Sequence, residues 1–497
     1  MRGLDAASAF AVATQDRTGS WHALSEPRIL ENAVVALSLT GSGRAEVRAA
    51  RARALCWLAS AVPQEHDRLV AAADRWLVAL STGSEIPALP DLAAHDGVHA
   101  RRALYLQAVG CAVGAPGADA RRLLDDAGGA LGAGRGRGVK PWQRILLLAF
   151  EALACSALDI PLPVNTLEEL ERAQAADGSF YGMPLVTGML HLALTRTAPD
   201  HAVTRRCREN LLACQQADGT WRFAISEVWD TGLMVRALRG HPGFETASLT
   251  RALEFLTAVQ NEDGGWSCTA SLTSDNDTVG NTLLALAGTP WIGRVHAAAG
   301  DYARRHRTRE GLWTTWNSSD DTPAADVVAH MVAGIREAEL PGIDLGPARR
   351  WLAGLGAQGR WKSDWYIPPA YGAAEIGPAL HYASDGHEQS VLGQLLATQR
   401  ADGGWPRIPD EPYSSPAATG LALTALTASG AHAGEAAVER AVRFLLDAQT
   451  GRTWSDRPVM YGPRPFLTVT STQVHALAAR GLRDALLPAH RGLGAVR

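Results

Sequence analysis

The chain has few cysteines, few aromatic residues and no excess of charge of one sign. Its six cysteines are scattered over 497 residues, and no two form a CxxC pair, which argues against a zinc ribbon or a disulfide framework. We therefore expect a reduced, cytoplasmic protein. The formal net charge of −4 and the isoelectric point near 6.4 give no reason to expect a nucleic-acid partner.

Long apolar runs are missing as well. No run of about 18 apolar residues occurs, so we expect no membrane-spanning helix. The first 21 residues carry only a short apolar piece that ends before Asp16, which makes a poor signal peptide. The 49 glycines and 26 prolines indicate helices interrupted by many turns.

An internal repeat organises the chain. Its strongest copies are "RCRENLLACQQADGTW" (206–221), "RALEFLTAVQNEDGGW" (251–266) and "SVLGQLLATQRADGGW" (390–405). Weaker copies end at Phe180, Trp361 and Trp454, and more degenerate ones at Trp21 and Trp313. Each copy contains an amphipathic helix that ends in Gln, then a glycine turn, and then a second Ala/Leu-rich helix. Such helix pairs bury their apolar faces only by stacking or by closing into a ring.

The Gln and Trp of each copy predict a scaffold role, with Gln bonding free backbone groups at a helix end and Trp stacking over that end. This Gln–Gly-x-Trp pattern resembles the QW motif of squalene–hopene cyclases and other class II terpene cyclases. The resemblance implies an all-α fold of two α/α-barrel (α-toroid) domains in the terpene cyclase βγ architecture. It also implies that residues 1–21 and 228–497 form the catalytic β-type barrel, with residues 22–227 inserted as a γ-type barrel.

The stretch "SDNDTVGNTLLAL" (274–286) holds two acids directly before an apolar helix, where one would suffice as an N-cap. It resembles the acidic motif of class II cyclases. In the register anchored on the helix, Asp275 takes the first acid position, Asp277 the middle position of the proton donor, and Thr278 replaces the third Asp. In the other register Asn276 takes the middle position and the donor is lost. We prefer the first register because it keeps the essential carboxyl.

Three more segments resemble parts of the same family. "EVWDTGLMVRAL" (227–238) is similar to the helix that opens the catalytic domain. "PAADVVAHMVAGI" (323–335) resembles a helix whose Asp and His flank the acid, which implies that Asp326 and His330 lie near Asp277. "WKSDWYIPPAYGAAEIGPAL" (361–380) resembles the pocket segment, with Trp365 and Tyr371 at the family spacing.

The resemblance assigns Asp277 as general acid, assisted by Asp275, His330 and Asp326. Protonating an alkene needs an acid that is held protonated by burial and stabilised by neighbouring donors once its proton has left. It also needs aromatic faces around the carbocation, for which the candidates are Trp365, Tyr371, Trp316 and Tyr366. Each of these residues also has a purely structural alternative. Asp275 or Asp277 could be a plain N-cap, and His330 a core or surface histidine. Asp326 could be a charge on an exposed helix face, and Trp316 and Tyr366 could be packing aromatics.

A prenyl diphosphate is the expected substrate, because the chain is short for a triterpene cyclase and its aromatic content is only 6%. The candidates for diphosphate binding are Lys362, Arg360, Arg407 and Arg464. The family resemblance implies Mg²⁺ as a cofactor, with Glu85 in a vaguely similar segment and the other ligands unknown. No DDxxD motif of ionisation-initiated cyclases occurs, so the diphosphate should be retained.

We therefore predict that Asp277 protonates the terminal alkene of geranylgeranyl or farnesyl diphosphate and that a bicyclic labdane- or drimane-type diphosphate forms. The alternatives are a cyclase of squalene or of a prenylated aromatic, and a non-catalytic α-toroid or prenyltransferase-like subunit. Peripheral contact with a membrane and a homodimer are both compatible with the resemblance.

Overall fold

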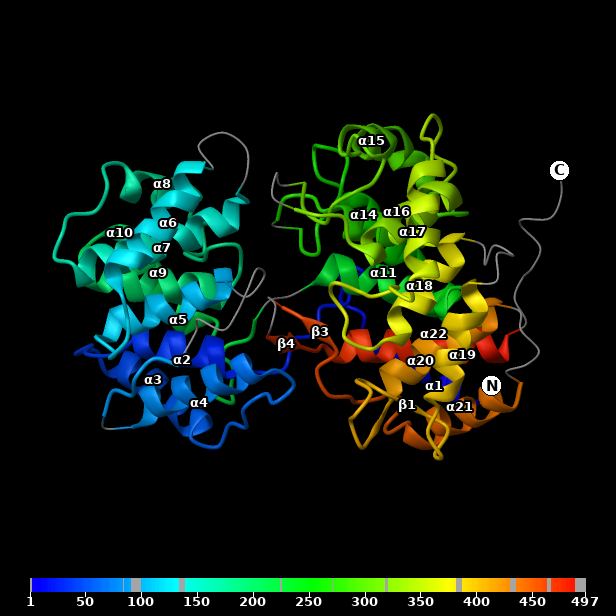
Figure 1. The fold of residues 1–497 in the computed structure, drawn as a ribbon, viewed down its shortest axis with the longest axis horizontal. Coiled ribbons are helices and arrows are strands. Elements are labelled where there is room, and N and C mark those ends of the chain that lie inside the picture. Colours follow the sequence, from blue (N-terminus) through cyan, green and yellow to red (C-terminus); the bar gives the residue numbers. More distant parts are fainter. Residues whose placement is uncertain are drawn as a thin grey trace.

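The structure, a computed structural model, is almost entirely helical and contains two helical units side by side (Figure 1). It describes residues 2–83, 85–90, 100–133, 139–223, 226–270, 272–317, 321–380, 387–429, 435–462 and 466–487. The all-α prediction is confirmed. None of the helices in these ranges combines the length and the hydropathy required to cross a bilayer.

The second unit is a closed ring of six inner helices. They are α11 (Glu227–Leu238), α14 (Asn276–Leu286), α16 (Ala325–Glu337), α18 (Ala370–Leu380), α20 (Pro416–Ser429) and α22 (Ser471–Leu486). Each packs against the next, and α22 packs against α11 to close the ring. Their sequences are Ala- and Leu-rich on every side, because each inner helix is buried on nearly all of its surface.

An outer layer of amphipathic helices surrounds this ring. It consists of α1 (Arg2–Thr14), α12 (Pro242–Phe244) with the π-turn η2 (Glu245–Leu249), α13 (Thr250–Ala258), α15 (Ile292–Arg305), α17 (Gly346–Ala357), α19 (His387–Ala397) and α21 (Glu435–Ala448). Helix α1, near the start of the sequence, therefore belongs to the second unit, where it packs against α22 and α12 (Figure 1). Two short antiparallel pairs, β1 (Trp405–Pro406) with β2 (Ser414–Ser415) and β3 (Met460–Tyr461) with β4 (Leu467–Thr468), complete it.

The first unit repeats the same two-layer plan. Its inner helices are α2 (Ile29–Ser38), α4 (Arg68–Thr82), α5 (Ala100–Val113), α7 (Pro141–Ala157) and α9 (Pro184–Thr197), and its outer helices are α3 (Ala45–Leu58), α6 (Ala120–Ala133), α8 (Thr166–Ala173) and α10 (Ala202–Ala213). The two units have separate hydrophobic cores. One joins Leu4–Trp21 to residues 228–482, and the other spans residues 29–221 with Phe466. The predicted domain boundaries fall between these cores and remain predictions.

The repeat holds each outer helix to the turn that follows it. In all seven tryptophan copies the indole N–H donates to a backbone carbonyl nine or ten residues earlier, for example Trp266 to Leu256 at 2.7 Å. In several copies the Gln amide bonds both the turn and the next outer helix: Gln399 Nε2 donates to the Gly403 and Ala437 carbonyls, both at 2.8 Å. The Trp bond to a backbone carbonyl is therefore present even in the degenerate copies at Trp21 and Trp313, although the copy at Trp313 has no Gln.

Replacing one repeat tryptophan tests how much its indole hydrogen bond stabilises the fold. We expect Trp266→Phe to lower the free energy of unfolding by about 1–3 kcal/mol, because the buried Leu256 carbonyl loses its donor. Chemical denaturation measures the loss. Trp291→Phe is the matched control, because the indole N–H of Trp291 has no partner among the described residues. Equal losses in the two variants would contradict the role of this hydrogen bond.

Candidate active site

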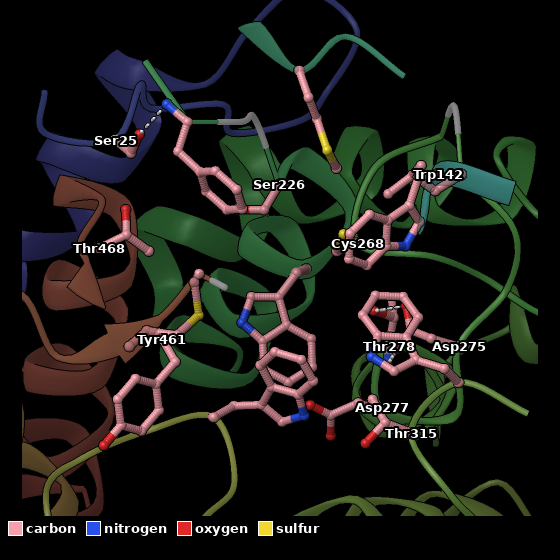
Figure 2. A pocket seen from close by; sticks show the side chains of 18 of the residues that line it. Ser25, Trp142, Ser226, Cys268, Asp275, Asp277, Thr278, Thr315, Tyr461 and Thr468 are labelled. Atoms are coloured by element: carbon pink, nitrogen blue, oxygen red, sulfur yellow. Dashed lines mark hydrogen bonds between the residues drawn. The ribbon is translucent and has the colours of Figure 1, made fainter. Parts of the chain in front are cut away.

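A cavity of about 240 Å³ lies between the two units, and most of its wall is apolar. The first unit contributes residues from α5, α7 and α9: Tyr105, Trp142, Gln143, Leu146, Leu185 and Val186. The second unit contributes the acids at the start of α14 together with Trp229, Trp316, Trp365 and Tyr366. Figure 2 shows Asp275 and Asp277 at one end of the cavity and Ser25, Thr468 and Tyr461 at the other.

The first acid of the pair is the N-cap of α14. Asp275 Oδ1 accepts the backbone N–H of Thr278 at 2.7 Å, and its Oδ2 accepts the Thr278 hydroxyl at 3.0 Å. Burial raises the pKa of Asp275 to about 7, and the charge of Asp277 adds to that effect. Thr278, which replaces the third family Asp, therefore serves to fix the capping carboxyl.

Asn276 turns away from the cavity. Its side-chain amide donates to the Thr314 carbonyl at 2.6 Å and to Asn317 Oδ1 at 2.7 Å, and the residue is fully buried. It is not among the residues that line the cavity, whereas both of its neighbours are. This geometry favours the register in which Asp277, and not Asn276, occupies the donor position.

Asp277 and His330 form a direct pair at the acid end. Asp277 lies in the first turn of α14, is 7% exposed and lines the cavity. Its Oδ1 is 2.6 Å from Nδ1 of His330 on α16. The imidazole is held by the edges of Trp229 and Tyr371, with ring centroids at 5.8 and 6.2 Å.

The charge on His330 is sustained by carboxylates on two sides. Burial alone lowers the pKa of His330, but Asp277 and Glu375 outweigh it and raise this pKa to about 9. Glu375 Oε2 lies 3.3 Å from His330 Nε2. Burial acts against the Glu375 carboxylate, yet Arg236 and Arg480 hold its pKa well below the usual range. His330 is therefore an imidazolium at neutral pH, and each of its ring nitrogens faces the side chain of an acidic residue, Asp277 or Glu375.

Asp326 lies behind the cavity wall. Its Oδ2 accepts the Ser363 hydroxyl and, at 3.0 Å, the backbone N–H of Asp364. Burial, followed by the charge of Asp277, raises its pKa to about 6. Because residues 361–366 carry Trp365 and Tyr366, the geometry makes Asp326 an anchor for these aromatics, and it does not line the cavity.

The aromatic wall joins both units. Trp316 meets Trp142 and Trp365 edge-to-face, with centroid distances of 6.5 and 5.9 Å. Tyr366 lines the cavity and stacks on Tyr371 at 4.1 Å. The prediction that Tyr371 lines the pocket needs correction, because Tyr366 covers it from the cavity side.

The sequence reasoning missed two wall tryptophans and a neighbouring cation. Trp229 donates its indole N–H to Tyr366 Oη at 2.9 Å and so orients that ring. Trp142 comes from the other unit, and nearby Lys140 Nζ lies 3.2 Å from the centroid of the Trp316 ring. The signal for Trp229 was present, since it is the Trp of the "WDT" segment. Nothing in the sequence alone pairs Trp142 with α14.

The predicted diphosphate contacts do not line the cavity where the structure describes them. Arg360 and Lys362 are exposed, and Arg407 is neutralised by Glu411 at 2.9 Å. This part of the prediction is corrected for all three: two are solvated and the third is bound to a carboxylate. Arg464 lies outside the described residues.

The described residues do not form a metal site. Across those ranges no group of three or more His, Cys, Asp or Glu side chains is arranged to hold an ion. Glu85 is exposed and has no such group around it. The described residues therefore offer no side-chain cluster that fits a protein-held Mg²⁺ ion.

Comparison with known proteins agrees with the fold. The family described as "Squalene-hopene cyclase C-terminal domain" matches residues 185–321. Drimenyl diphosphate synthases from Streptantibioticus cattleyicolor and Streptomyces showdoensis are each 27% identical, over 66% and 65% of this chain. These alignments span 58% and 55% of the two relatives' lengths.

A solved structure resembles the whole chain. The ent-copalyl diphosphate synthase from Streptomyces platensis superposes with a TM-score of 0.61 at 18% identity, covering 97% of this chain and 98% of that one. At this identity the similarity establishes the fold, which is the two-unit α-toroid that the family resemblance implied. The matching domain, the relatives and the fold together support a class II terpene cyclase.

Proposed function

We propose that the chain cyclises a linear prenyl diphosphate, geranylgeranyl or farnesyl diphosphate, by protonating its terminal alkene from Asp277. The product is a bicyclic labdane- or drimane-type diphosphate. One observation carries the proposal: a carboxyl group paired with a buried imidazolium opens into an aromatic-walled cavity. The names of the two bacterial relatives, both drimenyl diphosphate synthases, support the diphosphate substrate.

The proton leaves from the Asp277 oxygen that does not bond His330. Oδ1 is engaged with Nδ1 of His330, so in the proposed reaction Oδ2 is the oxygen that carries the proton to the alkene. When this proton adds to the alkene, the new carboxylate is stabilised by the imidazolium and by the N-terminus of α14. Both donors are in place before the reaction, so neither needs to reorganise as charge develops.

The rest of the cavity controls the carbocation. Electrons of the next two alkenes form two C–C bonds in turn, and the final tertiary cation becomes neutral by losing a proton from a neighbouring carbon. Ring faces of Trp316, Trp365 and Tyr366 attract the positive charge without reacting with it. The predominantly apolar wall keeps water, which would quench the cation, away from it.

The two ends of the cavity suit the two ends of such a substrate. Opposite Asp277, the wall carries hydroxyl groups of Ser25, Thr468 and Tyr461 (Figure 2). The Thr468 hydroxyl is buried and has no hydrogen-bond partner among the described residues. We place the alkene end of the substrate at Asp277 and its diphosphate at this hydroxyl-bearing end.

Incubation with defined substrates tests the proposal. We expect the purified protein to convert farnesyl or geranylgeranyl diphosphate to a product that yields a bicyclic alcohol after phosphatase treatment, identified by mass spectrometry. Squalene is the parallel substrate, and a chelator arm measures the predicted need for Mg²⁺. Conversion of squalene alone, or of none of the three, would refute the proposed substrate class.

A further inference from the structure

A cluster of buried charges lies next to His330, on the side away from Asp277. Glu375 on α18 is 2.6 Å from Arg236 on α11 and also forms an ion pair with Arg480 on α22. The side chains of Glu375, Arg236 and Arg480 are 3%, 8% and 13% exposed. The Glu375 oxygen that meets Arg236 is the one that faces His330 Nε2 at 3.3 Å.

The charges around His330 come from every inner helix packed on it. Helix α14 presents Asp277, and α18 presents Glu375 and the Tyr371 ring. Behind Glu375 stand the guanidinium groups of α11 and α22, and Asp326 lies one turn earlier on the same helix as His330. On this side, within the described ranges, Glu375 is the carboxylate that separates the imidazolium from the two guanidinium groups.

A scaffold role does not account for this arrangement. Buried ion pairs stabilise a fold weakly, and apolar side chains of similar volume commonly do better. An inner-ring position filled by Glu375 in an otherwise Ala-rich helix therefore needs another reason. That reason is electrostatic: two guanidinium groups without a carboxylate would disfavour a third cation beside them.

We propose that Glu375 is a positioning residue that keeps His330 in its imidazolium form and thereby sets the upper pH limit at which the Asp277–His330 pair can donate a proton. This inference deepens the proposed function and rests on it for its catalytic consequence. The protonation of His330 itself is measurable without any substrate. Arg236 and Arg480 hold Glu375 ionised, so it stays a carboxylate across the working range.

The first test measures the His330 ring directly. In full-length protein labelled with ¹³Cε1-histidine, NMR follows ring protonation against pH, and the His330 signal is assigned by its loss in His330→Gln. We expect Glu375→Gln to lower the titration midpoint of His330 by about 1 pH unit or more. An unchanged midpoint would overturn the proposal.

The control variant neutralises Asp484, a carboxylate that contacts Arg480 and is one residue further from His330 in this cluster than Glu375. Asp484 lies 3.9 Å from Arg480 and 2.5 Å from Arg483 but does not contact His330. We expect Asp484→Asn to leave the His330 midpoint in place; an equal fall there would also overturn the proposal. Should Glu375→Gln fail to fold, Glu375→Gln/Arg480→Gln takes its place, because it removes one charge of each sign and still takes the carboxylate from His330.

The second test separates positioning from damage to the fold. In Glu375→Gln the alkaline limb of the kcat profile should move to lower pH, since the pair loses its proton more easily. The low-pH plateau should be retained, because the fully protonated pair still donates. A uniform loss at every pH would show a structural role only. Absence of turnover in the wild type would refute the proposed function, whereas the NMR result would still decide the charge state of His330.

Discussion

Asp277→Asn should lower the rate of prenyl diphosphate cyclisation by about 10³-fold or more, because the amide has no proton acidic enough to give to an alkene. The variant keeps the shape of the side chain and can still bond His330. Folding should therefore be retained, and the loss should appear in kcat. Single-turnover assays with farnesyl and geranylgeranyl diphosphate measure it.

Asp275→Asn is the matched control, because Asn caps helices about as well as Asp. Asp275 faces Thr278, and its carboxylate has a capping role in the structure. We expect its replacement to cost about tenfold or less in rate. If the two variants lost activity equally, or if Asp277→Asn kept the wild-type rate, the assignment of the proton donor would fail.

Gly280→Ala should damage both stability and catalysis. Helices α14 and α16 cross at this glycine: a Cβ there would lie 2.5 Å from the backbone carbon of His330 and 2.6 Å from its Cβ. The helices must move apart, which costs about 1–3 kcal/mol of unfolding free energy and lengthens the contact between Asp277 and His330. Urea denaturation and the cyclisation assay measure the two effects.

Gly293→Ala is the matched control for Gly280→Ala. Gly293 lies in outer helix α15, and a Cβ there meets no atom within 4 Å. We expect it to raise stability slightly, by about 0.5–1 kcal/mol, because alanine favours a helix. A stable and fully active Gly280→Ala protein would show that the helix crossing does not set the geometry of the pair.

The repeat predicts most of the fold because it encodes local chemistry. A glycine with positive φ, such as Gly264, and the Gln and Trp around it fix one turn between two helices. Repetition of that unit leaves stacked or closed rings as the arrangements that bury every apolar face. The closure of α22 onto α11 is tertiary, and the family resemblance supplied it in advance.

The site residues show the same contrast between local and tertiary information. Asp275, Asp277 and His330 lie on two neighbouring helices, and the short motifs around them were sufficient to single them out. Glu375, Arg236 and Arg480 lie on three different helices, each as a lone charge among apolar residues, so only the closed ring brings them together.

The Lys and Arg residues predicted to bind the diphosphate do not line the cavity, and the reason is different. Arginine and lysine side chains at sequence positions close to a pocket segment are more often solvated or paired than aimed into the pocket. Arg360 is bonded to Gln358, and Arg407 to Glu411. For Arg360 and Lys362, sequence proximity to the aromatics at 365 and 366 therefore carried no information about which way the side chains point.

The place of α1 has a consequence for how the chain matures on the ribosome. Its apolar face, with Leu4, Ala7 and Ala11, is fully buried only once α22 has been made, although α12 covers part of it earlier. At roughly 5–20 translated residues per second, that interval is about half a minute to a minute and a half, long enough for the intervening unit to fold first. Until then α1 is an apolar segment that lacks part of its partner surface, a place where chaperone capture or premature aggregation would begin.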